Sequence, residues 1–128
     1  MEIKLTKEES EEYFYNALCN GLMYINQYGI DVIVDEKAYK KAKNTLKKNN
    51  KECCYEDVLM EVLRQGDKLN FCETEEMKDN YVTLDLVHQR VEKTEVRHLM
   101  AMFEEDDDAD TADCIIQSVL FDGEIIYG

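Results

Sequence analysis

The sequence predicts an α+β domain in which five to six helices pack on a small, largely antiparallel sheet. Apolar residues recur at helical spacing in six segments of the 128-residue chain. Short β-branched or alternating runs stand between several of these segments. Three helical segments end in a glycine, Gly29, Gly66 or Gly123, that precedes a short run of strand type. Helices and short strands in this order are typical of helices laid on an antiparallel sheet.

The first helix begins after Thr6, because Thr6 and Glu9 have the spacing of a capping box. Gly29 ends it, since glycine takes the left-handed conformation at no cost, although Asn20-Gly21 offers an alternative break into two pieces. Two apolar stripes cover most of its circumference: Phe14, Ala17, Leu18, Gly21, Ile25 and Tyr28, then Tyr15, Cys19, Leu22 and Met23. Such a helix is either central to the core or covered by another chain, so one alternative is a homo-oligomer formed through it.

The middle of the chain predicts strands and helices in alternation. Ile30 to Val34 is alternating and β-branched, which indicates a strand. Asp35 then caps a lysine-rich helix over 36–48, and its thin apolar stripe places it on the outside. The helix over 55–65 has a full apolar stripe and ends at Gly66.

Two further strands, three helices and a final strand account for the rest. Residues 68–73 and 81–83 predict strands joined by a polar stretch over 74–80. Thr83, Thr94 and Asp110 are the expected helix starts. The stripes expected to face the core are Leu84, Val87, His88 and Val91; Val96, Leu99, Met100 and Phe103; and Ala112, Ile115, Ile116, Val119 and Leu120. Residues 124–127 predict a terminal strand after Gly123.

The chain is strongly acidic, with 29 Asp and Glu against 15 Lys and Arg and a net charge of -14. A surface of this charge repels nucleic acid and anionic membranes and attracts cationic partners. Hydrophobic residues make up 45% of the chain, so we expect a single globular domain over residues 1–128. No apolar run approaches the roughly 18 residues that span a bilayer, and residues 1–5 lack the pattern of a signal peptide. These features predict a cytoplasmic protein with no membrane contact.

Five cysteines stand at positions 19, 53, 54, 72 and 114. In a chain without a secretory signal we expect them to be reduced thiols. Cys19 and Cys114 fall within apolar helical patterns, which favours small core residues over nucleophiles.

The densest negative charge lies between the last two predicted helices. The candidate interaction residues are Glu104, Glu105, Asp106, Asp107, Asp108, Asp110 and Asp113. A calcium loop from Asp106 would require glycine sixth and glutamate twelfth, where this chain has Thr111 and Gln117. Two interpretations remain: a solvated linker whose last aspartates cap a helix, or a docking patch for a basic surface.

The basic residues are concentrated on one helix. Seven of the 15 lie within 36–51 beside a single acidic residue, which leaves the rest of the chain at a net charge of -20. This helix either offsets the self-repulsion of an acidic body or contacts phosphate. In a winged-helix arrangement the helix over 55–65 would enter the major groove, but Glu56, Asp57 and Glu61 have the wrong charge for DNA. We therefore do not expect double-stranded DNA binding.

No catalytic, cofactor or metal motif is recognised in the sequence. His88 and His98 do not have the spacing of a zinc site. We expect His88 to be half-buried and hydrogen-bonded. The sequence has no glycine-rich phosphate loop, nucleophile elbow or metalloprotease pattern. We therefore assign no catalytic residue, no cofactor and no metal, and we expect no enzymatic activity.

Three stretches of the C-terminal half carry a resemblance: 83–91 (TLDLVHQRV), 97–100 (RHLM) and 107–113 (DDADTAD), with 54–60 (CYEDVLM) as a fourth. In these stretches the chain resembles small acidic proteins of gut bacteria and of their phages or mobile elements. The resemblance implies an accessory protein of a mobile element, and it implies no activity, cofactor or site.

The leading hypothesis is a non-enzymatic protein that presents an acidic surface to a basic protein partner. In a mobile-element setting the partner would be a nucleic-acid-binding protein, inhibited by a mimic of the charge of DNA. Charged residues would speed association, while a few aromatic or aliphatic anchors would supply most of the affinity. The alternatives are a small ligand-binding domain or enzyme with an unrecognised pocket, and an oligomeric structural module.

Overall fold

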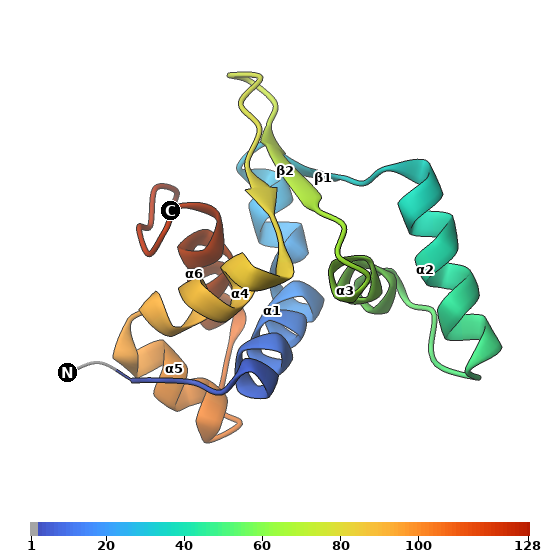
Figure 1. The fold of residues 1–128 in the computed structure, drawn as a ribbon. Helices are drawn as coiled ribbons and strands as arrows, with labels where there is room; N and C mark the ends of the chain where they lie inside the picture. Colours follow the sequence, from blue (N-terminus) through green and yellow to red (C-terminus); the bar gives the residue numbers. More distant parts are fainter. Residues whose placement is uncertain (1–2) are drawn as a thin grey trace.

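The computed structural model describes residues 3–128, and within them it has six α-helices and a three-stranded antiparallel sheet (Figure 1). It is 59% helical and 10% strand, which confirms the predicted α+β class. Met1 and Glu2, part of the stretch compared with a signal peptide, lie outside the described residues. The elements are α1 (Lys7–Gln27), β1 (Ile30–Ile33), α2 (Glu36–Lys48), α3 (Tyr55–Arg64), β2 (Leu69–Glu73), β3 (Tyr81–Val82), α4 (Leu84–Arg90), the 3-10 helix η1 (Val91–Lys93), α5 (Val96–Phe103) and α6 (Ala109–Leu120).

Helices α1 and α6 form the centre of the core. Every residue of α6 from Thr111 to Leu120 is buried. Helix α1 approaches α6 most closely at Gly21, where a Cβ atom would lie 2.9 Å from Ile116 Cδ1 and 3.1 Å from Ala112 Cβ. The glycine therefore serves close helix packing, and α1 continues through Asn20-Gly21 without the alternative break.

The predicted helix ends are confirmed where the signal is local. The Thr6 hydroxyl accepts from the Glu9 amide at 3.1 Å, and the Glu9 carboxylate accepts from the Thr6 amide at 2.9 Å, which completes the capping box. Gly29, Gly66 and Gly123 have φ of 84°, 91° and 92°, the left-handed region that favours glycine after a helix.

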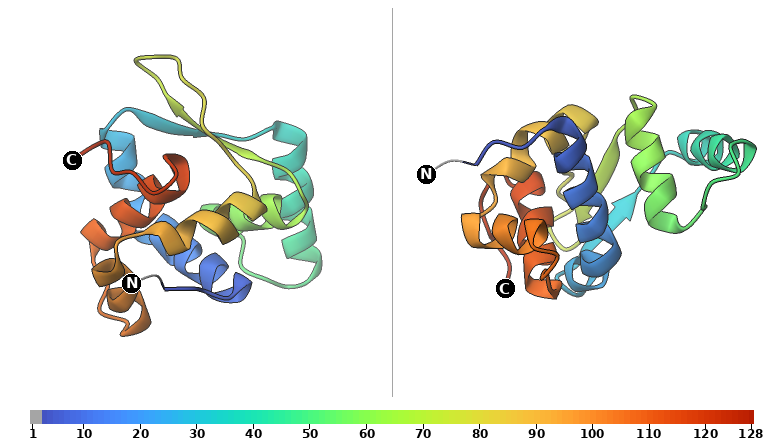
Figure 2. Two further views of the ribbon diagram at one scale, coloured as in Figure 1. Left: turned by 60° about the vertical axis from the view of Figure 1, so that its left-hand side comes forward. Right: turned by 90° about the horizontal axis from the view of Figure 1, so that it is seen from below.

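The sheet has the order β1-β2-β3 with both pairs antiparallel. Ile30 pairs with Glu73 and Ile33 with Asn70, so β1 lies along all of β2 except Leu69. Beyond the paired part of β2 and β3, the chain turns over 74–80 at the tip of a hairpin that projects from the helices (Figures 1 and 2). All three strands predicted before residue 84 are therefore confirmed.

Helix α2 lies on the outside, as its thin apolar stripe predicts. It buries Ala38, Ala42 and Leu46 and packs against α3, on the far side from α6 (Figure 2). The Asp35 carboxylate caps it by accepting from the Ala38 amide at 3.0 Å. The lysines of α2 are exposed except Lys43, which is half-buried.

The predicted terminal strand is wrong, because residues 124–127 have no strand partner. The buried side chain of Gln117 takes the place of a strand. Its Oε1 accepts from the amides of Ile126 and Tyr127, both at 2.9 Å, and its Nε2 donates to the Tyr127 carbonyl at 3.0 Å. One amide side chain on α6 thus bonds the backbone N–H and C=O groups that would otherwise pair with a neighbouring strand.

Three further predictions need correction. Helix α5 begins after Glu95 and not at Thr94, which instead ends η1 and makes no side-chain capping bond to α5. Helix α6 is capped by Asp108 and not by Asp110, since Asp108 Oδ1 accepts from the Thr111 amide at 2.9 Å. Cys19 is exposed, whereas Cys114 is buried as expected. Cys19 lies on the second apolar stripe of α1, and this stripe is only partly covered, since Tyr15 and Leu22 are half-buried and Cys19 and Met23 are exposed.

Candidate docking groove between helices α1 and α5

Helix α5 turns a different face to the core from the one its apolar stripe predicts. Its buried residues are His98, Leu99 and Met102, whereas Val96, Met100 and Phe103 are 37%, 43% and 70% exposed. The prediction was therefore wrong for three of the four stripe residues. A polar contact fixes the observed rotation, because buried His98 lies 2.9 Å from the hydroxyl of Thr111 on α6.

Exposed Phe103 borders a groove between α5 and the start of α1, which we call the α1–α5 groove. One half is mainly apolar and has a volume of about 270 Å³. It is lined by six apolar side chains together with Lys4 and Glu9: Ile3, Leu5, Tyr13, Leu99, Met100 and Phe103. The other half has a volume of about 250 Å³ and is lined by four carboxylates, those of Glu9, Glu12, Glu105 and Asp107. Glu9, Tyr13 and Phe103 line both halves, so an apolar slot and an acidic slot adjoin, with Phe103 exposed and Tyr13 buried where they meet.

The acidic segment that borders the groove is ordered by the end of α5. The Glu105 amide donates to Met102 at 3.2 Å, and the Asp106 amide donates to Ala101 at 2.9 Å, which are the two bonds of a Schellman motif. Glu105 has a φ of 56° and so occupies the left-handed position that glycine usually fills. The backbone therefore holds the Glu105 carboxylate in place at the groove, whereas a flexible linker would leave its position variable.

The charge of this segment is not neutralised within the described part of the chain. No lysine or arginine among residues 3–128 forms an ion pair with Glu104, Glu105, Asp106 or Asp107. The same segment follows the C-terminus of α5, where the helix dipole already carries partial negative charge. A cationic group bound at this place would relieve repulsion among these carboxylates.

The remaining candidate interaction residues have other roles. The backbone amide of Thr111 lowers the pKa of Asp108, which caps α6. Asp113 is only 7% exposed, accepts from the Tyr28 hydroxyl at 2.9 Å and from Gln117 at 2.8 Å, and so does not belong to the acidic surface. Its hydrogen bond raises the pKa of Tyr28 to about 12.

Glu9, Glu12 and Phe103 are lining residues that sequence reasoning missed. Glu9 and Glu12 are far from the acidic run in sequence, and only the packing of α1 beside α5 brings them to it. For Phe103 a signal existed, since it ends a short apolar helix directly before five acidic residues. Because Asp and Glu are almost never fully buried, an aromatic residue directly before five of them is expected near the surface.

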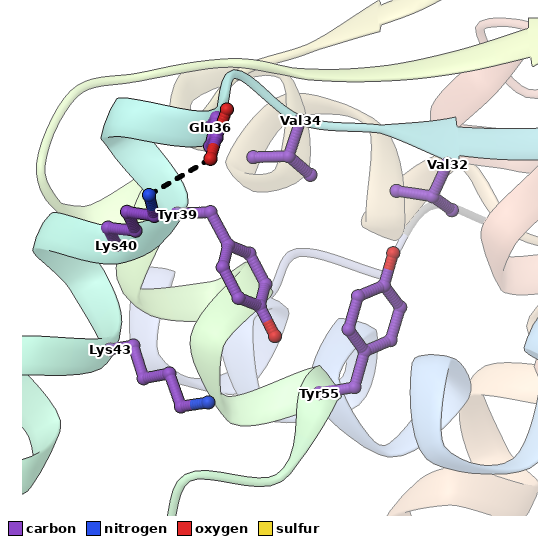
Figure 3. Close-up of a pocket in the computed structure, with 7 residues that line it drawn as sticks. All are labelled: Val32, Val34, Glu36, Tyr39, Lys40, Lys43 and Tyr55. Carbon is purple, nitrogen blue, oxygen red and sulfur yellow. Dashed lines mark ion pairs between the residues drawn. The ribbon is translucent and has the colours of Figure 1, made fainter.

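A second groove lies between β1 and the helices α2 and α3, and its volume is about 500 Å³ (Figure 3). The rings of Tyr39 and Tyr55 face this space, with centroids 6.2 Å apart. Lys40 at its edge is already paired with Glu36 at 2.9 Å. Val32, Val34 and Lys43 complete its lining.

The half-buried, hydrogen-bonded His88 predicted from the sequence is confirmed. Its Nε2 lies 2.9 Å from Glu11 Oε2, and the same carboxylate accepts from Arg64 at 3.3 Å. This cluster ties α4 and α3 to α1 and has a structural role.

The chain matches no family model, and no curated protein or solved structure matches it either. Across residues 3–128, every helix is too short or too polar to cross a lipid bilayer.

Proposed function

We propose that this chain is a non-enzymatic binding protein that docks a basic, amphipathic segment of another protein in the α1–α5 groove. The observation that carries the proposal is the meeting of exposed Phe103 with four carboxylates that have no basic partner in the described chain. Apolar side chains of the segment would enter the slot beside Met100, and its lysines or arginines would lie along the acidic slot.

The two halves of the groove would contribute differently to binding, because one is mainly apolar and the other is acidic. Aromatic anchors in desolvated pockets supply most of the free energy of binding, so Phe103, which is 70% exposed, would provide most of the affinity. The surrounding carboxylates would speed encounter and select basic partners, and their effect would weaken with salt. Proteins that bind nucleic acid have basic segments of this kind. Inhibition of such a protein by a cytoplasmic accessory protein of a mobile element is the biological role we propose.

The test measures binding of a fluorescein-labelled helical peptide that has leucines on one face and lysines on the other. Phe103→Ala should weaken the Kd by about tenfold or more, because it removes a central anchor. Glu105→Gln combined with Asp107→Asn should lower the association rate and flatten the dependence of Kd on salt.

Two control variants match these changes away from the groove. Met23→Ala removes an apolar side chain of α1 that is 78% exposed, and Glu75→Gln with Glu76→Gln removes two exposed charges from the 74–80 turn. Neither control should change the Kd by more than about twofold. Equal losses of affinity in the controls and the groove variants would show that binding depends on net charge or on nonspecific hydrophobic adsorption. That result would overturn the proposal.

A further inference from the structure

Three potential metal ligands meet where α5 packs on α6. They are His98 on α5 and Asp110 and Cys114 on α6, and their ligand atoms all lie within 4.8 Å of one another. His98 Nε2 lies 3.8 Å from Asp110 Oδ2. Asp110 and Cys114 are four residues apart and therefore share one face of α6. The cluster is separate from the α1–α5 groove, since none of the three residues lines it.

One ring nitrogen of the buried histidine of this cluster lacks a hydrogen-bond partner. His98 is 3% exposed, and its Nε2 atom has no hydrogen-bond partner. A buried polar atom left without a hydrogen bond destabilises the folded state. Because Nε2 faces Asp110 and Cys114, a ligand bound among the three would remove this destabilisation.

The other nitrogen of the ring fixes its orientation. His98 Nδ1 lies 2.9 Å from Thr111 Oγ1, and Thr111 is itself buried. When Nδ1 carries the proton and donates to this hydroxyl, Nε2 keeps its lone pair toward the cluster. Histidine ligands of metals are held in the same way, by a hydrogen bond from the ring nitrogen that does not bind the metal.

The donor set selects the class of metal. Calcium and magnesium prefer oxygen ligands alone, whereas imidazole, thiolate and carboxylate together suit Zn²⁺. Bond lengths of about 2.0–2.3 Å in a tetrahedral site place ligand atoms about 3.3–3.8 Å apart, so the cluster has to contract by up to about 1 Å. The Asp110 side chain is 63% exposed and free to make this movement.

We propose that His98 Nε2, Asp110 and Cys114 Sγ bind one Zn²⁺ ion, with water in the fourth position. The ion would displace the thiol proton of Cys114, which bulk base takes up, and would connect α5 to α6. This site was missed in the sequence because only one of its ligands is a histidine and because its first two ligands lie on different helices.

The test is a titration of the reduced, metal-free full chain with Co²⁺, which takes the same ligands as Zn²⁺ and has a visible spectrum. Cys19→Ser with Cys54→Ser serves as the starting protein, since both of these thiols are exposed. We expect one ion per chain, a thiolate-to-cobalt charge-transfer band and the visible bands of a tetrahedral site. Zn²⁺ should displace the cobalt and raise the Tm.

Variants then assign the ligands. Cys114→Ser should abolish the charge-transfer band, whereas the control Cys72→Ser, which removes another buried cysteine, should retain it. Asp110→Asn changes an exposed side chain, so it should fold normally and weaken the affinity for Co²⁺ by at least about tenfold. Thr111→Val should weaken it by about 10- to 100-fold through loss of the hydrogen bond to the ring.

Either of two results would overturn the site. One is the absence of stoichiometric Co²⁺ binding to the starting protein. The other is an unchanged affinity in Asp110→Asn, which decides the matter even where Cys114→Ser does not fold.

Discussion

Replacing Gln117 by leucine should detach the C-terminal segment while leaving the packing of α6 intact. Gln117 is fully buried, and its side chain makes four hydrogen bonds, three to the backbone of Ile126 and Tyr127 and one to Asp113. Leucine has a similar size and a good helix propensity. The substitution therefore removes the hydrogen bonds without opening a large cavity.

The expected loss can be worked from these contacts. Four hydrogen bonds at about 0.5–1.5 kcal/mol each amount to roughly 4 kcal/mol. Burial of the leucine methyl groups returns about 1 kcal/mol. We therefore expect the free energy of unfolding to fall by about 3 kcal/mol, and the Tm to fall by roughly 10 °C for a domain of this size.

Urea unfolding followed by circular dichroism measures this difference, and hydrogen exchange reports the amides of Ile126 and Tyr127 directly. Gln89→Leu is the matched control, because Gln89 is exposed on α4 and its change should stay within about 0.5 kcal/mol. A loss below about 1 kcal/mol in Gln117→Leu, with both amides still protected, would refute the role assigned to this side chain.

Two further predictions concern the core and the sheet. Gly21→Ala should destabilise the protein by about 1 kcal/mol in thermal unfolding, because a contact of 2.9 Å with Ile116 Cδ1 outweighs the better helix propensity of alanine. Adding Ile116→Val should recover part of this loss. A Gly21→Ala variant that is more stable than the wild type would contradict the close packing. Burial opposes ionisation of Glu73, but hydrogen bonds from Tyr127 and Asn80 outweigh it and lower the pKa of this carboxyl. A lowered pKa in the folded state means stability that is present above the unfolded value of about 4.3 and is lost as the pH falls through the folded value. Glu73→Gln should therefore lose less stability than the wild type when urea unfolding is repeated at successively lower pH below about 5, and parallel losses would exclude Glu73 as a source of the acid sensitivity.

Helix starts were predictable wherever the cap depends on a few neighbouring residues. Thr6, Asp35 and Thr83 cap the helices that they were expected to cap, because each side chain bonds an amide only three residues away. The predicted start of α6 was wrong by two residues, because two nearby aspartates could each act as the cap. Asp108 and Asp110 are equivalent as sequence signals, and the path of the chain into the helix selects the first.

The candidate site was predictable only in part. The acidic run over 104–108 is visible in the composition, but its partners across the groove are not. Glu9 and Glu12 reach it through the packing of α1 beside α5, and Asp113 leaves it because α6 turns that carboxylate toward Tyr28. A period of 3.6 residues shows that two side chains share a helix face, and it does not show what that face meets.

By itself the sequence determined the α+β class, the order and ends of most elements, the acidity and the place of the densest negative charge. These properties depend on composition and on contacts within one or two helical turns. The tertiary structure decided that Phe103 stays exposed, that Gln117 replaces a strand partner, and that His98 meets Asp110 and Cys114. These outcomes depend on how far each helix is rotated and where it crosses its neighbour, and both are set by contacts between residues that are distant in the chain.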